Sequence, residues 1–190
     1  GKLPDWVSAK DVVLEMLRRH DVKGGVGKII EYYGDGLKEL SAMDRHVIAN
    51  MGAELGATTT VFPSDDETRK FLKSQERQAD WSELVADVDC EYQYHEEIVL
   101  DDLVPLIALP TSPGNVVPVE EVAGKSISQV VIGSSANPGL RDFWIAGKIV
   151  EGKSTSPEVS FDINPTSRQV MQNMIKNRTF ANLITSGARY

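Results

Sequence analysis

The second half of the chain alternates between short β-branched runs and amphipathic stretches, and this alternation constrains the fold more than any other sequence feature. From residue 127 onward we predict a strand, a helix, a strand, a helix and a last strand, over Ile127–Ile132, Pro138–Val150, Val159–Ile163, Thr166–Lys176 and Leu183–Thr185. Strands joined through crossover helices run parallel. We therefore expect an α/β fold with a mostly parallel sheet, and a truncated second unit, since no helix follows its last strand.

The first half mixes helices and strands less regularly. We predict helices ending near His20 and over Asp44–Leu55, Asp66–Leu72 and Asp80–Val88, a buried strand over Lys28–Tyr33, and further strands over Thr58–Phe62, Glu96–Leu100 and Leu106–Leu109. The strongest loop signal is Thr111–Asn115 followed by Pro118. We therefore place a domain boundary there, with residues 1–118 in one α/β domain and residues 119–190 in a second, partial one.

Composition and charge exclude several classes of function. No apolar run approaches the roughly 18 residues of a membrane span, and the start of the chain lacks a signal-peptide pattern, so we expect a cytoplasmic protein without a membrane partner. The net charge of -8 makes nucleic acid an unlikely partner. The single cysteine, Cys90, can form neither an internal disulfide nor a thiolate metal site by itself, and we expect His20 and His95 to have structural or surface roles.

One candidate site is a polar ridge on the helix predicted after Asp44. His46, Asn50 and Glu54 follow one another at four-residue spacing and would share one side of that helix. Small residues beside them would let the helix approach neighbouring backbone closely. A carboxylate on such a helix can serve as a general acid, a general base or a ligand. The alternative is an ordinary solvated helix face.

A second candidate is the loop from Gly133 to Gly139, which joins a predicted strand to a helix. Ser134, Ser135 and Asn137 line it, Asn137 can cap the helix, and Pro138 suits the first helical position. Loops after parallel strands are where α/β proteins place ligands. The alternative is a plain capped turn. A phosphate-binding loop at Gly24–Lys28 is rejected, because the required spacing is absent and a strand follows.

The sequence resembles the aconitase and isopropylmalate dehydratase family. The resemblance rests on VIANMGAELGATT at residues 47–59 with VFP at 61–63, and extends through KIIEYYG at 28–34, SPGNVVPV at 112–119 and ISQVVIGS at 127–134. It implies three-layer α/β/α domains. It also implies a four-iron four-sulfur cluster acting as a Lewis acid, with three irons held by cysteines. Glu54 and Asn50 then match family residues beside the cluster and are the expected catalytic residues.

The cofactor-binding loop departs from the family pattern. The resemblance assigns cofactor binding to the loop that contains Ser134, Ser135 and Asn137. Because Ser135 stands where the family has a cluster cysteine, we do not expect Ser135 to be a metal ligand. The resemblance also implies a Cys-x-x-Cys pair after Tyr190, an N-terminal domain and a swivelling C-terminal domain. We therefore expect the chain to be a fragment covering the family's second domain and part of its third, inactive and without a bound cluster by itself.

The resemblance favours an aconitate hydratase-like hydro-lyase of the tricarboxylic acid cycle, which isomerises citrate and isocitrate through cis-aconitate. A small tricarboxylate would then be the partner of the whole protein. Two alternatives remain open from the sequence. One is the large subunit of an isopropylmalate or homoaconitate dehydratase, and the other is a degenerate, non-catalytic binding domain that lost a ligand at Ser135.

Overall fold

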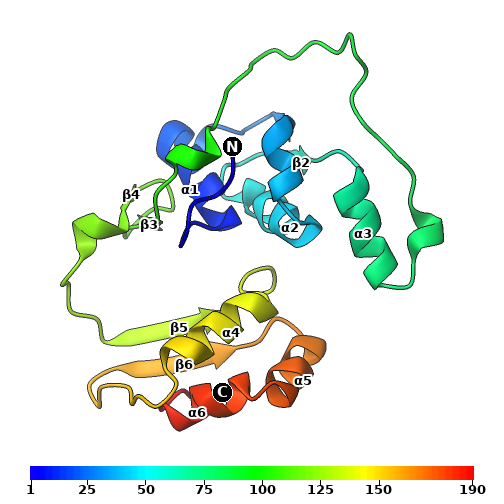
Figure 1. Cartoon of the computed structure of the whole chain (residues 1–190). Coiled ribbons are helices and arrows are strands. Elements are labelled where there is room, and N and C mark those ends of the chain that lie inside the picture. The colour runs from blue at the N-terminus through cyan, green and yellow to red at the C-terminus, as the bar shows by residue number, and fades with distance from the viewer. The chain divides into compact units, whose positions relative to one another are not determined.

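The computed structural model describes residues 1–190, which fold as two compact units, Gly1–Ala123 and Gly124–Tyr190 (Figure 1). The boundary placed after residue 118 in the sequence thus lies five residues before the division between the units. Two of the three small sheets are parallel, so the predicted α/β class with mostly parallel pairing is confirmed. None of the helices has the length and apolar character needed to cross a membrane.

Helix α1 (Ala9–His20) begins at a side-chain cap and organises the N-terminal unit. Ser8 N donates to Asp11 Oδ2 over 2.7 Å, which caps the helix start. The other carboxylate oxygen, Asp11 Oδ1, accepts from Leu106 N at 2.8 Å and thereby ties α1 to strand β3 (Leu106–Ala108). Apolar residues of α1 form the centre of this unit's core: Val12, Val13, Leu14 and Leu17.

The remaining elements of this unit surround that core. They are the strands β1 (Ile29–Glu31), β2 (Thr59–Val61) and β4 (Val116–Pro118), and the helices α2 (Ala42–Asn50) and α3 (Asp66–Ser74). β1 pairs with β2 in parallel, and β3 pairs with β4 in antiparallel. Ile30 packs on the core, whereas Ile29 is 66% exposed. The prediction of a fully buried strand is therefore wrong, because only one face of this two-stranded sheet is covered.

Two sequence predictions fail between Asp80 and Leu100. Residues 81–88 form no helix and residues 96–99 no strand, and nearly all of segment 81–99 is exposed. Its apolar residues have too few buried neighbours to organise an element. The loop predicted at Thr111–Asn115 is confirmed. It leads into Val116–Pro118, an unpredicted strand that hydrogen bonds to β3 make the second strand of a hairpin.

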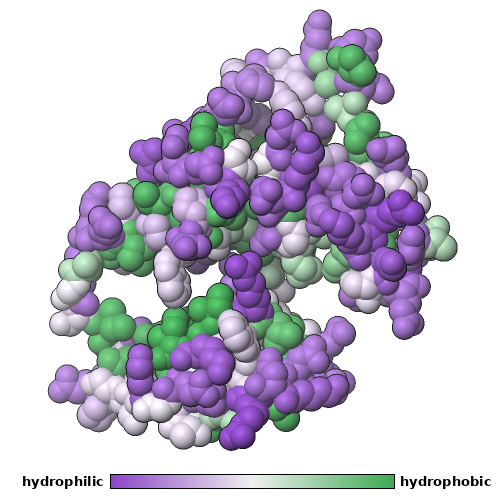
Figure 2. All heavy atoms as spheres, in the orientation of Figure 1, coloured by the Kyte–Doolittle hydropathy of each residue, from purple (hydrophilic) through white to green (hydrophobic).

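The C-terminal unit follows the alternating pattern: β5 (Gln129–Gly133), α4 (Leu140–Ile149), β6 (Ser160–Asn164), α5 (Arg168–Lys176) and α6 (Thr179–Thr185). β5 and β6 are parallel over five residue pairs. The covered sheet face and all three helices share one core, built from Phe143, Phe161, Ile163, Met174 and Leu183. The other face carries exposed apolar side chains, and Val131 there is 60% exposed. Figure 2 shows hydrophobic residues, in green, at the surface of this unit.

The last strand predicted at Leu183–Thr185 is wrong, because these residues end helix α6. The strand-like pairing occurs later, where Arg189 forms a parallel bridge with Asp162 of β6. Arg189 N donates to Phe161 O, and Ile163 N donates to Arg189 O, each over 2.8 Å. The expectation that the last strand lacks a covering helix is therefore also wrong, since α5 and α6 precede the pairing residue and pack on the same core.

Candidate functional site

The segment that carries Asn50 and Glu54 is shorter as a helix than predicted. Ser41 and Asp44 cap the start of α2, with Ser41 Oγ donating to Asp44 Oδ2 at 2.6 Å. The α-helix ends at Asn50, and Met51–Ala53 forms a single 3₁₀ turn. Because a 3₁₀ turn holds three residues instead of 3.6, Glu54 does not continue a regular ridge with His46 and Asn50. That part of the ridge prediction is wrong.

All three predicted ridge residues are nevertheless exposed. The side chains of His46, Asn50 and Glu54 make no hydrogen bond or ion pair within residues 1–190. Ile48 and Leu55, on the opposite side of the segment, are almost fully buried and fix it against the unit. The structure therefore presents the Asn50 amide and the Glu54 carboxylate on the surface of a firmly packed segment, where both are free to contact a ligand.

Close packing beneath this segment depends on Gly52. A Cβ atom at this position would lie 2.2 Å from Thr60 Oγ1 in strand β2, far inside a normal contact. Only glycine lets the 3₁₀ turn approach the strand so closely. The expectation that small residues here permit a close backbone approach is confirmed at Gly52.

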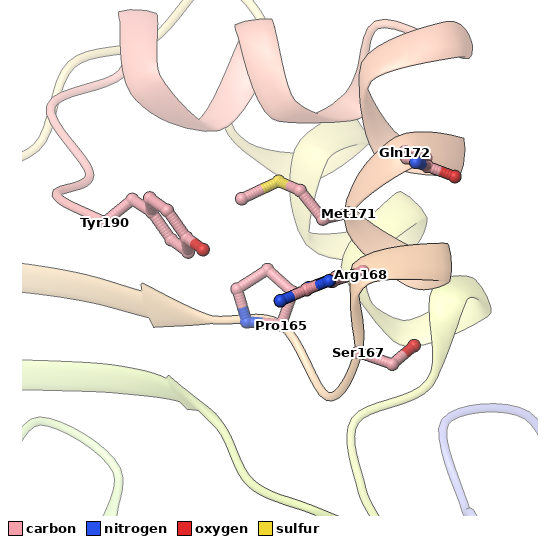
Figure 3. A pocket seen from close by; sticks show the side chains of 6 residues that line it. All are labelled: Pro165, Ser167, Arg168, Met171, Gln172 and Tyr190. Atoms are coloured by element: carbon pink, nitrogen blue, oxygen red, sulfur yellow. The ribbon is translucent and has the colours of Figure 1, made fainter.

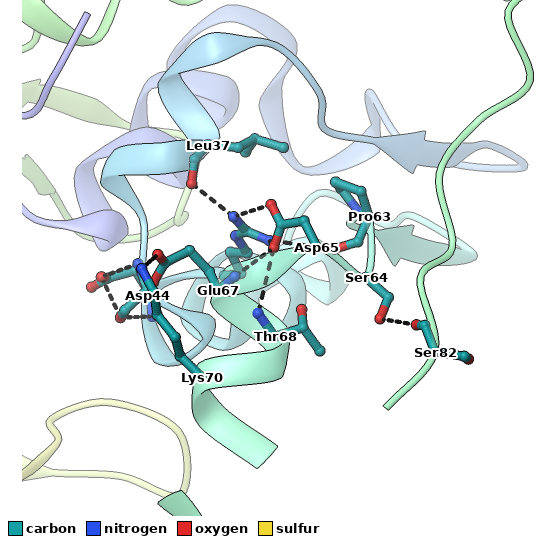
Figure 4. A network of polar contacts seen from close by, with 11 residues as sticks. Leu37, Asp44, Pro63, Ser64, Asp65, Glu67, Thr68, Lys70 and Ser82 are labelled. Atoms are coloured by element: carbon teal, nitrogen blue, oxygen red, sulfur yellow. Dashed lines mark hydrogen bonds and ion pairs between the residues drawn. The ribbon is translucent and has the colours of Figure 1, made fainter. Parts of the chain in front are cut away.

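Sequence reasoning missed Arg45, which anchors α2 from its buried side. Three of its partners, Leu37, Pro63 and Asp65, lie close together in Figure 4. The Arg45 guanidinium, 4% exposed, pairs in a bidentate way with Asp65, with two N–O distances of 2.8 Å. It also donates to Leu37 O at 2.7 Å and to Pro63 O at 3.3 Å. The sequence did contain a signal, because Arg45 lies three residues before Ile48 on the apolar stripe, where an arginine needs a buried partner.

The acidic partner of Arg45 also starts the next helix. Asp65 Oδ1 accepts from Glu67 N at 3.0 Å, so Asp65 is the N-cap of α3. The hydrogen bond from Arg45, stronger than the opposing effect of burial, holds the pKa of the Asp65 carboxyl below its ordinary value. This carboxylate thus joins α2 to the start of α3.

The second candidate, the loop between β5 and α4, also differs from expectation. The helix N-cap is Gly139, whose N–H donates to Asp142 Oδ2 at 2.8 Å, and neither Asn137 nor Pro138 lies in the helix. The predicted capping by Asn137 is therefore wrong. Ser134 and Ser135 are exposed and Asn137 is half-buried, so the loop does present polar side chains to a ligand.

A cavity of about 400 Å³ opens at the start of α5 in the same unit (Figure 3). It is lined by Pro165, Ser167, Arg168, Met171, Gln172 and Tyr190. No sequence motif points to these residues. The cavity follows strand β6 and the serine loop follows strand β5; since the two strands are parallel, both features lie at the carboxyl edge of the sheet.

The donor set does not fit an iron-sulfur cluster. Within residues 1–190 no three His, Cys, Asp or Glu side chains come together in an arrangement that could hold a metal ion. Cys90 is exposed and belongs to the N-terminal unit. His20 pairs with Glu96 at 2.5 Å and His95 contacts the Tyr33 hydroxyl, so these two histidines have partners within their own unit.

The chain belongs to the aconitase family, because the model of the aconitase family (aconitate hydratase) matches residues 1–126. Among curated relatives, the 3-isopropylmalate dehydratase large subunit 1 of Thermotoga maritima is 38% identical over 190 residues, covering 99% of this chain and 46% of the relative. The corresponding subunit of Methanopyrus kandleri is 37% identical, with 99% and 45% covered.

A further relative, the 3-isopropylmalate dehydratase large subunit 2 of Archaeoglobus fulgidus, is 36% identical over 170 residues, covering 90% of this chain and 41% of the relative. The chain thus spans less than half the length of these relatives. Their names agree with the alternative of an isopropylmalate dehydratase large subunit better than with the favoured citrate and isocitrate aconitase.

Proposed function

We propose that the whole protein to which this chain belongs is a hydro-lyase that dehydrates a branched hydroxydicarboxylate of the isopropylmalate type. The observation that carries this proposal is the 38% identity to an isopropylmalate dehydratase large subunit over 99% of the chain. A citrate or isocitrate substrate, which the sequence resemblance favoured, becomes the second choice. Because the relatives are named as large subunits, we also propose that the whole protein works with a smaller subunit.

Asn50 and Glu54 are the residues of this chain that we assign to the reaction. Dehydration removes a proton from one carbon, while the hydroxyl on the adjacent carbon leaves as water after it gains a proton. A carboxylate at Glu54 can accept or return a proton, and the Asn50 amide can hydrogen-bond a substrate oxygen. Support comes from the exposure of both side chains and from the rigid packing of Ile48, Gly52 and Leu55 behind them.

The substrate assignment is tested on the complete protein together with its partner subunit. Steady-state assays compare kcat/KM for 3-isopropylmalate with kcat/KM for citrate and isocitrate under anaerobic conditions. The proposal expects the isopropylmalate value to be the highest. A clear preference for citrate or isocitrate would overturn the substrate class, and turnover of none of the three would support a non-catalytic member.

The role of Glu54 is tested by Glu54→Gln, which keeps the shape of the side chain but removes its charge and basicity. We expect kcat to fall by about 100-fold or more, with the unfolding temperature unchanged because the side chain is exposed. His46→Gln is the matched control, since His46 is exposed on the preceding turns of the same segment. Equal activity of Glu54→Gln and His46→Gln would remove Glu54 from the mechanism.

A further inference from the structure

We propose that Ser135 is not an iron ligand, and that a thiol in place of its hydroxyl would supply one at the carboxyl end of strand β5. The inference rests on the proposed function only in that a hydro-lyase of this family is expected to carry an iron-sulfur cluster. The inference concerns which atom of this chain could bind such a cluster, and none of the relatives' names assigns that atom.

The first argument is the nature of the donor. Iron in these clusters is held by deprotonated sulfur, whereas a serine hydroxyl keeps its proton at neutral pH and is a harder, weaker donor. An alkoxide would need a nearby cation to stabilise it. Residues 133–139 contain no Lys, Arg or His, and the carboxylate of Asp142 accepts a hydrogen bond at the loop's end. The loop itself therefore supplies no cationic side chain to stabilise a deprotonated Ser135.

The second argument is the lack of a substitute. The other polar side chains of the loop, Ser134 and Asn137, offer only neutral oxygen and nitrogen atoms. The one thiol of the chain, Cys90, belongs to the other unit. No group of three metal-binding side chains exists within residues 1–190. Nothing in the described structure compensates for the absent thiolate at position 135.

The third argument is that the backbone is held firmly on the strand side of the loop. Gly133 pairs with Asn164 at the end of the parallel ladder, and a Cβ atom on Gly133 would lie 2.6 Å from Asn164 O. At the helix side, Asp142 holds Gly139. Ser135 itself is exposed, so a cysteine, which differs by one atom, fits there without disturbing the core. Ser135→Cys should therefore restore a ligand.

The test measures iron and sulfide in the complete protein after anaerobic reconstitution, together with visible absorption and electron paramagnetic resonance spectra. Four proteins are compared: wild type, Ser135→Ala, Ser135→Cys and the control Ser134→Cys. We expect Ser135→Ala to bind as much iron as wild type. Ser135→Cys should bind severalfold more than Ser134→Cys, because a thiolate is useful only at the cluster position. Circular dichroism verifies that all four are folded.

Two outcomes would overturn the proposal. Loss of iron in Ser135→Ala would show that the hydroxyl is a ligand, and equal iron in Ser135→Cys and Ser134→Cys would show that the loop is not positioned for a cluster. Activity measured on the same wild-type preparation separates this result from the proposed function. An inactive wild type with the expected iron pattern contradicts the function alone, and an active wild type that loses iron in Ser135→Ala contradicts the inference alone.

Discussion

Gly52 and Thr60 show at the scale of single residues how the candidate catalytic surface is held. Thr60 Oγ1 is buried and has no hydrogen-bond partner in the structure, and it lies where a Cβ on residue 52 would go. The threonine hydroxyl is part of a short, stiff side chain that cannot swing away. The contact therefore ties the 3₁₀ turn before Glu54 to strand β2.

We predict that Gly52→Ala lowers the free energy of unfolding by about 1–3 kcal/mol, because the added methyl overpacks this contact. Urea unfolding of the chain measures the loss. The same substitution in a Thr60→Ala background should cost clearly less, since the clashing oxygen is gone and no hydrogen bond is lost with it. An equal cost in both backgrounds would mean that the penalty arises elsewhere than at Thr60.

The Arg45–Asp65 pair acts at the scale of elements, because it joins two helices that are distant in the sequence. Removing the charge of Asp65 leaves a buried guanidinium without its anion, which is expensive even when the partner is partly exposed. Asparagine still caps a helix well. Asp65→Asn therefore removes the ion pair but keeps the cap of α3, whereas Asp65→Ala removes both.

We predict that Asp65→Asn costs about 1–3 kcal/mol at neutral pH. Since the pKa of Asp65 is lowered on folding, the pair's contribution is present above about pH 4 and is lost as the pH falls through the folded-state pKa. Wild type and Asp65→Asn should thus converge in stability under acid conditions. Asp35→Asn, at an exposed pair with Lys38, should change little. A pH-independent difference for Asp65→Asn would rule out the ion pair as its cause.

Helix α6 ends in residues for which the sequence predicted a strand. Thr179, Leu183 and Ser186 are all buried, and their spacing of four and three residues is that of a helix face. We predict that Leu183→Ala costs about 2–5 kcal/mol, because it opens a cavity beside Phe143 and Met174. Ile184→Ala, at a 38% exposed position, should cost about 0.5 kcal/mol or less. Comparable losses at both positions would contradict the packing of α6.

Elements with local signals could be predicted from the sequence, and those decided by distant contacts could not. Asp65 and Ser167 cap helices with their own side chains, Asp11 caps the start of α1, and all three helices were predicted. The short run Leu183–Thr185 fits a strand or a helix equally well, and only the core of the C-terminal unit decides between them.

The candidate site shows the same limit. Exposure of Asn50 and Glu54 followed from their position beside the apolar stripe. The 3₁₀ turn that breaks their ridge, the Arg45–Asp65 pair and the α5 cavity arise from contacts between elements, which periodicity alone does not contain.

At the scale of the whole molecule, the two units have separate cores with no buried residue in common. Each parallel sheet packs helices or core residues on one face and leaves apolar residues exposed on the other, including Ile29 and Val131. Each unit therefore has its own hydrophobic core, built on one face of its parallel sheet.

We expect a protease to cut the chain first in the connection between the two units. Residues 123–129 are all exposed, and Lys125 lies among them. Trypsin cuts after Lys or Arg, and the sequence has neither between Arg77 and Lys125, so trypsin cannot cut the exposed segment 81–99. Lys153 is also exposed, but its loop is tied down by Thr155, whose N–H and hydroxyl donate to Ser186 O at 2.7 and 2.8 Å. Proteolysis requires local unfolding around the cleaved bond, which these hydrogen bonds oppose.

We predict that limited trypsin digestion of the chain cuts after Lys125 before Lys153, giving fragments 1–125 and 126–190 that mass spectrometry identifies. Lys125→Gln should slow the first cut strongly without changing the unfolding temperature, because the side chain is exposed. Lys153→Gln is the control and should leave the first cut unchanged. Early cleavage at Lys153, or within the helices, would mean that the C-terminal unit is loosely folded and that its core does not hold it together as a separate unit.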